Sequence, residues 1–291
     1  MNRLFRLRTI LTAILLLIFV SSAIADKKID AVDKLFSLWD KKDTPGCALA
    51  IVKDGKIIYK QGYGLANLEL NIPIIPQSVF YIGSVSKQFV TMCIAILDKQ
   101  GKLSLDGDIR KHIPELPDYG PPITVRHLIY HTSGLRDYLT LLAIAGIDFG
   151  TYHEDDVVEL IAQQKELNFA PGEEYLYSNS GYFLLAVIVE RASGKSLRKF
   201  AEQNIFKPLG MKNSHFHDDY RMLIKNRASG YFPAEKDKYK NFISTFDCVG
   251  SGGLFTSVED LFLWDQNFYH HKVGGKELID LIHTKGKLNS G

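Results

Sequence analysis

Cysteine is scarce in this sequence, and neither sign of charge dominates it. The 291 residues include only Cys47, Cys93 and Cys248, with no Cys-x-x-Cys pair. Cys47 and Cys93 lie among apolar neighbours, as small core residues do, and no disulfide can be deduced from the sequence. There are 35 basic and 33 acidic residues, a balance that indicates neither a nucleic acid nor an anionic membrane as partner. No internal repeat, low-complexity tract or clear domain linker is present.

The N-terminus carries a long apolar run. Three arginines within residues 3–8 precede an apolar stretch over residues 10–20, and small residues follow up to Ala25. This order predicts a signal peptide over residues 1–25, with cleavage before Asp26. The alternative is an uncleaved membrane anchor, because the stretch falls only a little short of the roughly 20 residues that a span needs. Cleavage would leave 32 basic and 33 acidic residues in a secreted or periplasmic domain over residues 26–291.

Hydrophobic periodicity predicts a mainly helical chain with one β-hairpin. Two apolar runs, residues 47–52 and 56–63, are joined by Lys53-Asp54-Gly55, and Asp-Gly between such runs is a strong hairpin signal. Residues 205–250 are predicted to be rich in loops. Helices are expected over residues 30–40, 84–100, 124–134, 155–164, 182–192, from 196, 257–269 and 276–283. Because an isolated hairpin is marginally stable, further strands must complete its sheet.

Ser84 and Lys87 form a Ser-x-x-Lys pair at the start of the apolar helix predicted over residues 84–100. Side chains three residues apart share a helical face, so the hydroxyl and the amine can touch. The free N–H groups of a helix N-terminus favour developing negative charge at Ser84. A buried lysine with a lowered pKa is able to deprotonate a serine. The pair alone is a weak signal, since it occurs by chance in many proteins of this length.

Residues 80–87, Phe-Tyr-Ile-Gly-Ser-Val-Ser-Lys, closely resemble the nucleophile motif of the serine β-lactamase and penicillin-binding-protein superfamily. Residues 124–135, 171–182 and 251–261 resemble further stretches of its class C β-lactamase branch, which includes esterases and D-amino-acid peptidases. The resemblance covers most of residues 30–270. It implies an α+β fold of the β-lactamase/transpeptidase type, in which helices flank an antiparallel sheet and a helical subdomain is added.

The resemblance also implies roles for four residues. Ser84 corresponds to the nucleophile that forms the acyl-enzyme, and its backbone N–H to one oxyanion-hole donor. Lys87 corresponds to the general base of acylation. Tyr177 corresponds to the residue that passes a proton to the leaving group and helps to activate the deacylating water. Asn179 corresponds to the residue that holds the lysine and contacts the substrate amide. The expected activity is that of an exported serine hydrolase on amides or esters, without a cofactor or metal.

One motif of this superfamily has no counterpart in the sequence. The superfamily carries Lys-Thr-Gly or His-x-Gly on a strand beside the nucleophile, and that strand supplies the second oxyanion N–H. The segment His283-Thr284-Lys285-Gly286 has a lysine in place of the glycine and follows a predicted helix. The sequence stops before the strands that complete the superfamily's sheet. We therefore expect a C-terminally truncated domain.

The identity of the substrate stays open among a β-lactam, a D-amino-acid peptide, including one derived from peptidoglycan, and a small ester. The class A branch is disfavoured, because no Ser-Asp-Asn triplet is present. A zinc hydrolase is an alternative, since His215-Phe216-His217-Asp218-Asp219 partly resembles a metallo-β-lactamase motif, although Tyr220 replaces its final histidine. A third possibility is a non-hydrolysing protein that binds penicillin or cell-wall peptides, or acts as a sensor.

Overall fold

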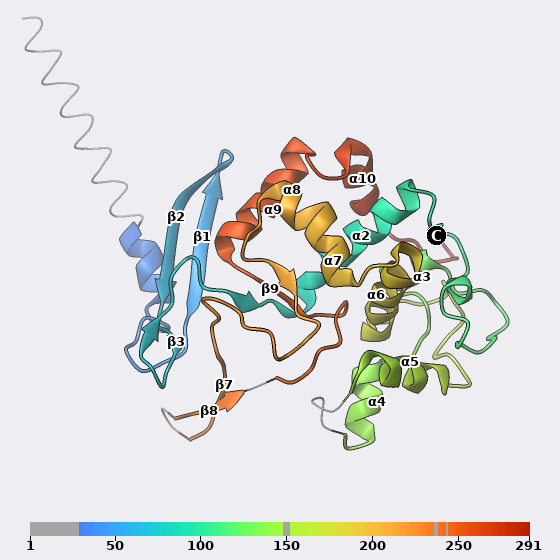
Figure 1. Cartoon of the computed structure of the whole chain (residues 1–291), viewed down its shortest axis with the longest axis horizontal. Coiled ribbons are helices and arrows are strands. Elements are labelled where there is room, and N and C mark those ends of the chain that lie inside the picture. The colour runs from blue at the N-terminus through green and yellow to red at the C-terminus, as the bar shows by residue number, and fades with distance from the viewer. Residues whose placement is uncertain (1–28, 148–151, 236–237, 243) are drawn as a thin grey trace, which may run out of the picture. The chain divides into compact units, whose positions relative to one another are not determined.

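The computed structural model describes residues 29–147, 152–235, 238–242 and 244–291 (Figure 1). The predicted signal peptide lies outside the described residues. Contacts within the chain divide it into two compact units, residues 1–76 and 77–291. Within the described ranges, no helix combines the length and the apolar character that crossing a membrane requires.

The first unit contains the predicted hairpin. Strands β1 (Cys47–Lys53) and β2 (Lys56–Tyr63) pair antiparallel, with Cys47 opposite Tyr63, and they are the long blue arrows of Figure 1. The turn residues Asp54 and Gly55 have φ values of 51° and 71°. Two consecutive positive φ angles are those of a type I′ turn, whose twist matches that of the strands. The hairpin prediction is therefore confirmed, with an additional bulge between Ile51 and Val52.

A helix over residues 29–36 packs within the same unit. The ring of Phe36 stacks on that of Tyr63 with 5.2 Å between centroids. The carboxylate of Asp33 accepts hydrogen bonds from the hydroxyls of Tyr59 and Tyr63. Strands β3 (Leu65–Asn67) and β4 (Ile72–Pro73) form a second antiparallel pair. These contacts attach the helix to the hairpin through one carboxylate and one aromatic pair.

The second unit is mainly helical. Its helices are α2 (Lys87–Lys99), α3 (Val125–Ile129), α4 (Tyr138–Ile144), α5 (Glu154–Ala162), α6 (Asn179–Ser193), α7 (Leu197–Ala201), α8 (Lys207–Leu209), α9 (Val258–His270) and α10 (Gly275–Ile282). Short 3-10 turns cover Gly83–Ser86 and Ile109–Lys111, and a π-helical turn covers Glu202–Phe206. Most predicted helices are present, although α3 ends at Ile129, five residues before the predicted end.

Short strands in the second unit hold distant segments together. Strands β5 (Phe80–Tyr81) and β6 (His215–Phe216) both pair antiparallel with β9 (Leu254–Thr256), in the order β5-β9-β6. Strands β7 (Gly230–Pro233) and β8 (Tyr239–Phe242) form a separate hairpin. The described part of residues 205–250, a range predicted to be rich in loops, contains the strands β6, β7 and β8 and the helical turn α8.

The core of the second unit surrounds α2. Figure 1 shows α2 among α6, α7 and α10, and residues of these helices contact one another. Phe89, Val90, Met92 and Cys93 of α2 are fully buried. A helix that is apolar nearly all round is stable only where neighbours cover it on every side, as they do here. The sheets and helices together give the predicted α+β fold.

Candidate active site

Ser84 lies in the 3-10 turn that precedes α2, not in the first turn of the α-helix as the sequence predicts. This turn leads from β5, and its Gly83 has a φ of 52°. The buried Ser86 fixes the turn, because its hydroxyl donates to the Gly83 carbonyl at 2.5 Å and accepts from the Leu254 N–H at 3.2 Å. Ser84 itself remains exposed. The position of Ser84 is thus set by the attachment of this turn to β9.

Lys87 contacts three oxygen atoms from three separate parts of the sequence. Its Nζ lies 3.0 Å from Ser84 Oγ, 3.1 Å from Asn179 Oδ1 and 2.5 Å from the Ser251 carbonyl oxygen. The side chain is buried. Burial lowers the pKa of Lys87, while Tyr177 and the charge of Asp137 act in the opposite direction. Desolvation favours the neutral amine, which is the form that accepts a proton.

Tyr177 contacts the same hydroxyl from another direction. Its OH donates to Ser84 Oγ at 2.8 Å, and Lys87 Nζ lies 4.9 Å from the centre of its ring. Tyr177 precedes α6, whose first residue is Asn179. The structure therefore brings together the four residues that the sequence predicts for the site: Ser84, Lys87, Tyr177 and Asn179.

His131 supports the segment that carries Tyr177. Its Nδ1 accepts the Ser178 N–H at 3.2 Å, its carbonyl accepts the Leu176 N–H, and its ring lies 4.4 Å from that of Tyr177. Burial and the nearby Lys87 lower the pKa of His131 to about 4, so the ring is neutral at pH 7. In the sequence, His131 belongs to the segment His131-Thr132-Ser133-Gly134, which lies within residues 124–135, one of the stretches that resemble the family.

Two further residues of the site were missed from the sequence. Asp137 Oδ2 accepts the first N–H of α6, that of Asn179, at 2.5 Å. The Ser251 hydroxyl bonds to the Tyr138 hydroxyl at 2.8 Å, which fixes the segment whose carbonyl holds Lys87. Gly250, with φ of 107°, must be glycine because an added Cβ would lie 2.5 Å from the Tyr182 carbonyl oxygen. In the sequence, the resemblance of residues 251–261 to a stretch of the class C branch was the signal that pointed to this segment.

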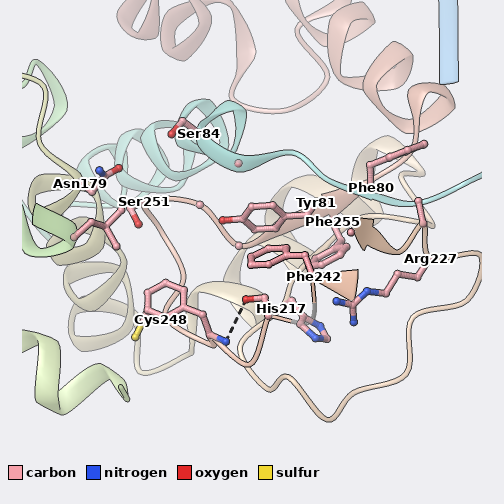
Figure 2. A pocket seen from close by; sticks show the side chains of 18 of the residues that line it. Phe80, Tyr81, Ser84, Asn179, His217, Arg227, Phe242, Cys248, Ser251 and Phe255 are labelled. Carbon is pink, nitrogen blue, oxygen red and sulfur yellow. Dashed lines mark hydrogen bonds between the residues drawn. The ribbon is translucent and has the colours of Figure 1, made fainter. Parts of the chain in front are cut away.

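A cavity of about 450 Å³ opens at Ser84 (Figure 2). Aromatic rings form much of its wall, with the side chain of Asn179 near Ser84 and those of His217 and Arg227 further away. The aromatic residues that line it are Phe80, Tyr81, Tyr138, Phe242, Phe246 and Phe255. A concave, largely apolar wall with a few polar groups is typical of a site for a small molecule or a peptide side chain.

The other motifs that the sequence suggested do not contact Ser84 or Lys87, although His217 lines the far part of the cavity. Residue His283 follows α10, and the Thr284 carbonyl accepts the Tyr130 hydroxyl at 2.7 Å. His215 Nε2 and His217 Nδ1 lie 3.2 Å apart, while Asp218 pairs with Arg198. Within the described ranges, no group of three or more histidine, cysteine or acidic residues is placed to hold a metal ion.

Comparison with known proteins yields one consistent family. The model of the Beta-lactamase family matches residues 30–283. Penicillin-binding protein 4* of Bacillus subtilis (strain 168) is 30% identical over 268 residues, which cover 88% of this chain and 59% of that protein. A D-aminopeptidase of Brucella anthropi is 32% identical over 227 residues, covering 76% of this chain and 42% of that protein.

Solved structures give the same result. The octameric penicillin-binding protein homologue from Pyrococcus abyssi superposes with a TM-score of 0.76 at 28% identity, covering 90% of this chain and 60% of that one. This chain thus spans less than two thirds of each of these three relatives. The family match nevertheless extends over most of the chain, and it includes every residue of the Ser84 site. The chain belongs to the beta-lactamase family, a group of serine hydrolases with penicillin-binding-protein and D-aminopeptidase members.

Proposed function

We propose that this chain forms an acyl-enzyme on Ser84 and hydrolyses amide or ester substrates. The observation that carries the proposal is the pair of hydrogen bonds at one hydroxyl: Ser84 Oγ receives them from Lys87 at 3.0 Å and from Tyr177 at 2.8 Å. A serine needs an adjacent base to become a nucleophile at neutral pH. Lys87 and Tyr177 are the ionisable groups that touch it.

In acylation, the neutral amine of Lys87 takes the proton of Ser84, and Oγ attacks the substrate carbonyl carbon. The resulting tetrahedral oxyanion is stabilised by the backbone N–H of Ser84. Asn179 has its Oδ1 on Lys87 and also lines the cavity. Its NH₂ group is therefore the part that reaches a substrate carbonyl.

Collapse of the intermediate breaks the bond to the leaving group. Tyr177, in contact with both Ser84 and Lys87, gives a proton to the departing amine or alcohol and regains one from the lysine ammonium. A water molecule then attacks the Ser84 ester: Tyr177 accepts a proton from this water while its own phenolic proton passes to the neutral amine of Lys87. As the bond between Ser84 Oγ and the acyl carbon breaks, the Lys87 ammonium gives its proton to Oγ. Each proton that leaves one group is thereby received by another, and the enzyme returns to its starting state.

The substrates that we propose are β-lactams, D-amino-acid peptides and small esters. The names of the similar proteins, a penicillin-binding protein and a D-aminopeptidase, support the first two classes. The exposed position of Ser84 beside an aromatic cavity supports an acyl group with an apolar side chain. The assignment of the site to the class C type rests on the Tyr-x-Asn pair Tyr177 and Asn179.

The test uses a fluorescent penicillin and a fluorophosphonate probe on the full chain, with a 4-nitrophenyl ester to follow turnover. We expect both probes to label the wild type and Ser84→Ala to remove labelling and turnover. Ser104→Ala, an exposed serine outside the cavity, is the matched control and should match the wild type. Ester turnover by Ser84→Ala at the wild-type rate would refute the proposal. Labelling by penicillin that persists without turnover of any ester would favour the non-hydrolysing binder instead.

We also propose that residues 1–25 direct export. The support is the order of arginines, apolar run and small residues in the sequence. N-terminal sequencing of the protein recovered from the periplasm or medium should begin at Asp26. Recovery of the full chain in the membrane fraction would favour the uncleaved anchor.

A further inference from the structure

Arg227 brings a permanent charge into the cavity beside Ser84. Among the described residues that line this cavity, no other side chain is a lysine, an arginine or an acid. The remaining wall is mostly aromatic, with small polar groups and His217. Figure 2 shows the guanidinium pointing inwards, towards the rings of Phe255 and His217. Removing a charged group from water costs free energy, so a guanidinium in a mostly aromatic wall is expected to have a binding partner.

The backbone holds Arg227 firmly in this position. Its two neighbours bond to the same residue before β5: the Val79 N–H donates to the Asn226 carbonyl at 2.8 Å, and the Ala228 N–H donates to the Val79 carbonyl at 2.9 Å. The guanidinium carbon lies 5.0 Å from the centre of the Phe255 ring. A cation over an aromatic face is attracted to it, so the side chain is oriented as well as anchored.

Arg227 has no anionic partner in the part of the chain that the structure describes. Two nearby arginines do have one: Arg221 pairs with Asp219 at 2.8 Å, and Arg198 pairs with Asp218 at 2.6 Å. Burial lowers the pKa of Arg227, and no carboxylate opposes that effect. The two histidines near it, His215 and His217, have no anionic form that could pair with the guanidinium, and burial lowers their pKa values. The guanidinium donors are thus available to a ligand.

The position of Tyr177 indicates which part of a substrate enters the cavity. Tyr177 contacts Ser84 but is not one of the described residues that line the cavity. The leaving group must depart beside Tyr177, because that residue gives it a proton. The cavity opens on another side of Ser84, so it receives the acyl group that stays on the serine.

We propose that Arg227 is a specificity-determining residue that binds a carboxylate on the acyl group of the substrate. The preferred acyl group then has an apolar or aromatic body, which packs on Tyr81 and Phe255, and a carboxylate at its far end. This inference rests on the proposed function, since it assigns the acyl half of the Ser84 substrate. A planar guanidinium suits this task because it can donate two parallel hydrogen bonds to a carboxylate.

The test compares two esters of matched shape on the full chain. Both are 4-nitrophenyl esters of 3-phenylpropanoic acid, one with a para-carboxylate and the other with a para-carboxamide. We expect the wild type to have a kcat/KM roughly tenfold or more higher for the carboxylate ester. Arg227→Gln should reduce kcat/KM for that ester by roughly tenfold to a hundredfold, the usual range for loss of a charge-assisted contact. Its kcat/KM for the carboxamide ester should stay within about twofold, which also shows that the variant is folded.

Two controls make the outcome specific. Arg221→Gln, a nearby surface arginine outside the cavity wall, should leave both esters unchanged. The 3-phenylpropanoyl ester of 4-hydroxybenzoate, which carries its carboxylate on the leaving group, should not respond to Arg227→Gln. Equal rates for the two matched esters, or an equal loss with either carboxylate position, would overturn the inference while Ser84-dependent turnover upheld the proposed function. No Ser84-dependent turnover of any ester would remove both.

Discussion

Asp137 connects two helix starts and the charge state of Lys87, so its replacement by asparagine tests the site in two ways. One carboxylate oxygen caps α4 by accepting the Thr140 N–H at 3.0 Å and the Thr140 hydroxyl at 3.2 Å. The other accepts the Asn179 N–H at 2.5 Å. An asparagine has one acceptor oxygen, and its NH₂ group cannot accept. Asp137→Asn therefore leaves one of the two helix starts without its partner.

The expected loss of stability follows from that missing acceptor. A partly buried N–H left unsatisfied costs about 1–3 kcal/mol. For a chain of this size, 1 kcal/mol lowers Tm by about 2–4 °C. Thermal unfolding followed by circular dichroism measures the change. Asp280→Asn is the matched control, because Asp280 forms an exposed pair with Lys276, and such pairs contribute about 0–1 kcal/mol.

The same substitution has a predicted effect on the pH dependence of activity. The negative charge of Asp137 raises the pKa of Lys87. Removing it lowers that pKa further, so the neutral amine persists to lower pH. The acidic limb of the kcat/KM profile should move towards lower pH in Asp137→Asn and stay in place in Asp280→Asn. A shift towards higher pH, or a Tm equal to that of the control, would refute this account of Asp137.

Three further predictions concern single residues of the site. Tyr177→Phe should lower kcat by about 10²–10⁴-fold, the usual share of a general acid–base group, and should leave Tm nearly unchanged because Tyr177 is exposed; an intact kcat would contradict its role. The pKa of His131 is lowered to about 4 from about 6.5 in the unfolded chain, so the unfolded state binds more protons in this window and stability should fall as pH drops from about 6.5 to 4. Urea unfolding at pH 7, 5.5 and 4.5 tests this, and His131→Gln should show a weaker dependence on pH. Ser180→Ala should lower the free energy of unfolding by about 2–4 kcal/mol, because its buried hydroxyl donates to the Arg136 carbonyl and accepts the Tyr138 N–H; a loss below about 0.5 kcal/mol in urea unfolding would contradict that assignment.

The parts of the fold that the sequence predicted are those with a local pattern. Asp54 and Gly55 define the hairpin, because two consecutive positive φ angles are permitted there at low cost. The apolar run after Ser84 predicts a buried helix. Ser84 and Lys87 were found through their spacing, and Tyr177 and Asn179 through the resemblance of residues 171–182 to a motif of the family. Each of these signals depends on neighbours that lie within a few positions along the chain.

The rest of the site depends on contacts between distant segments and on backbone atoms. The Ser251 carbonyl that holds Lys87 comes 164 residues later. Every residue offers a backbone carbonyl, so no residue type marks this contact in the sequence. Strands β7 and β8 carry mixed polar and aromatic residues with no regular alternation. The cavity wall that contains Arg227 is assembled from such segments, which is why the sequence did not reveal it.

The Ser251 carbonyl on Lys87 has a consequence for the order in which activity appears during refolding. Lys87 reaches its three acceptors only when the segments around residues 84–87, 177–179 and 251 have closed on one another. Contacts of such wide sequence separation form late, because loop-closure entropy opposes them. A refolding chain can thus have its full helical signal and still be unable to react with a fluorophosphonate. The rate at which Ser84 becomes reactive towards the probe therefore reports the last closure step. This rate should equal the rate at which β9 pairs with β5, and it should be slower than the formation of α2.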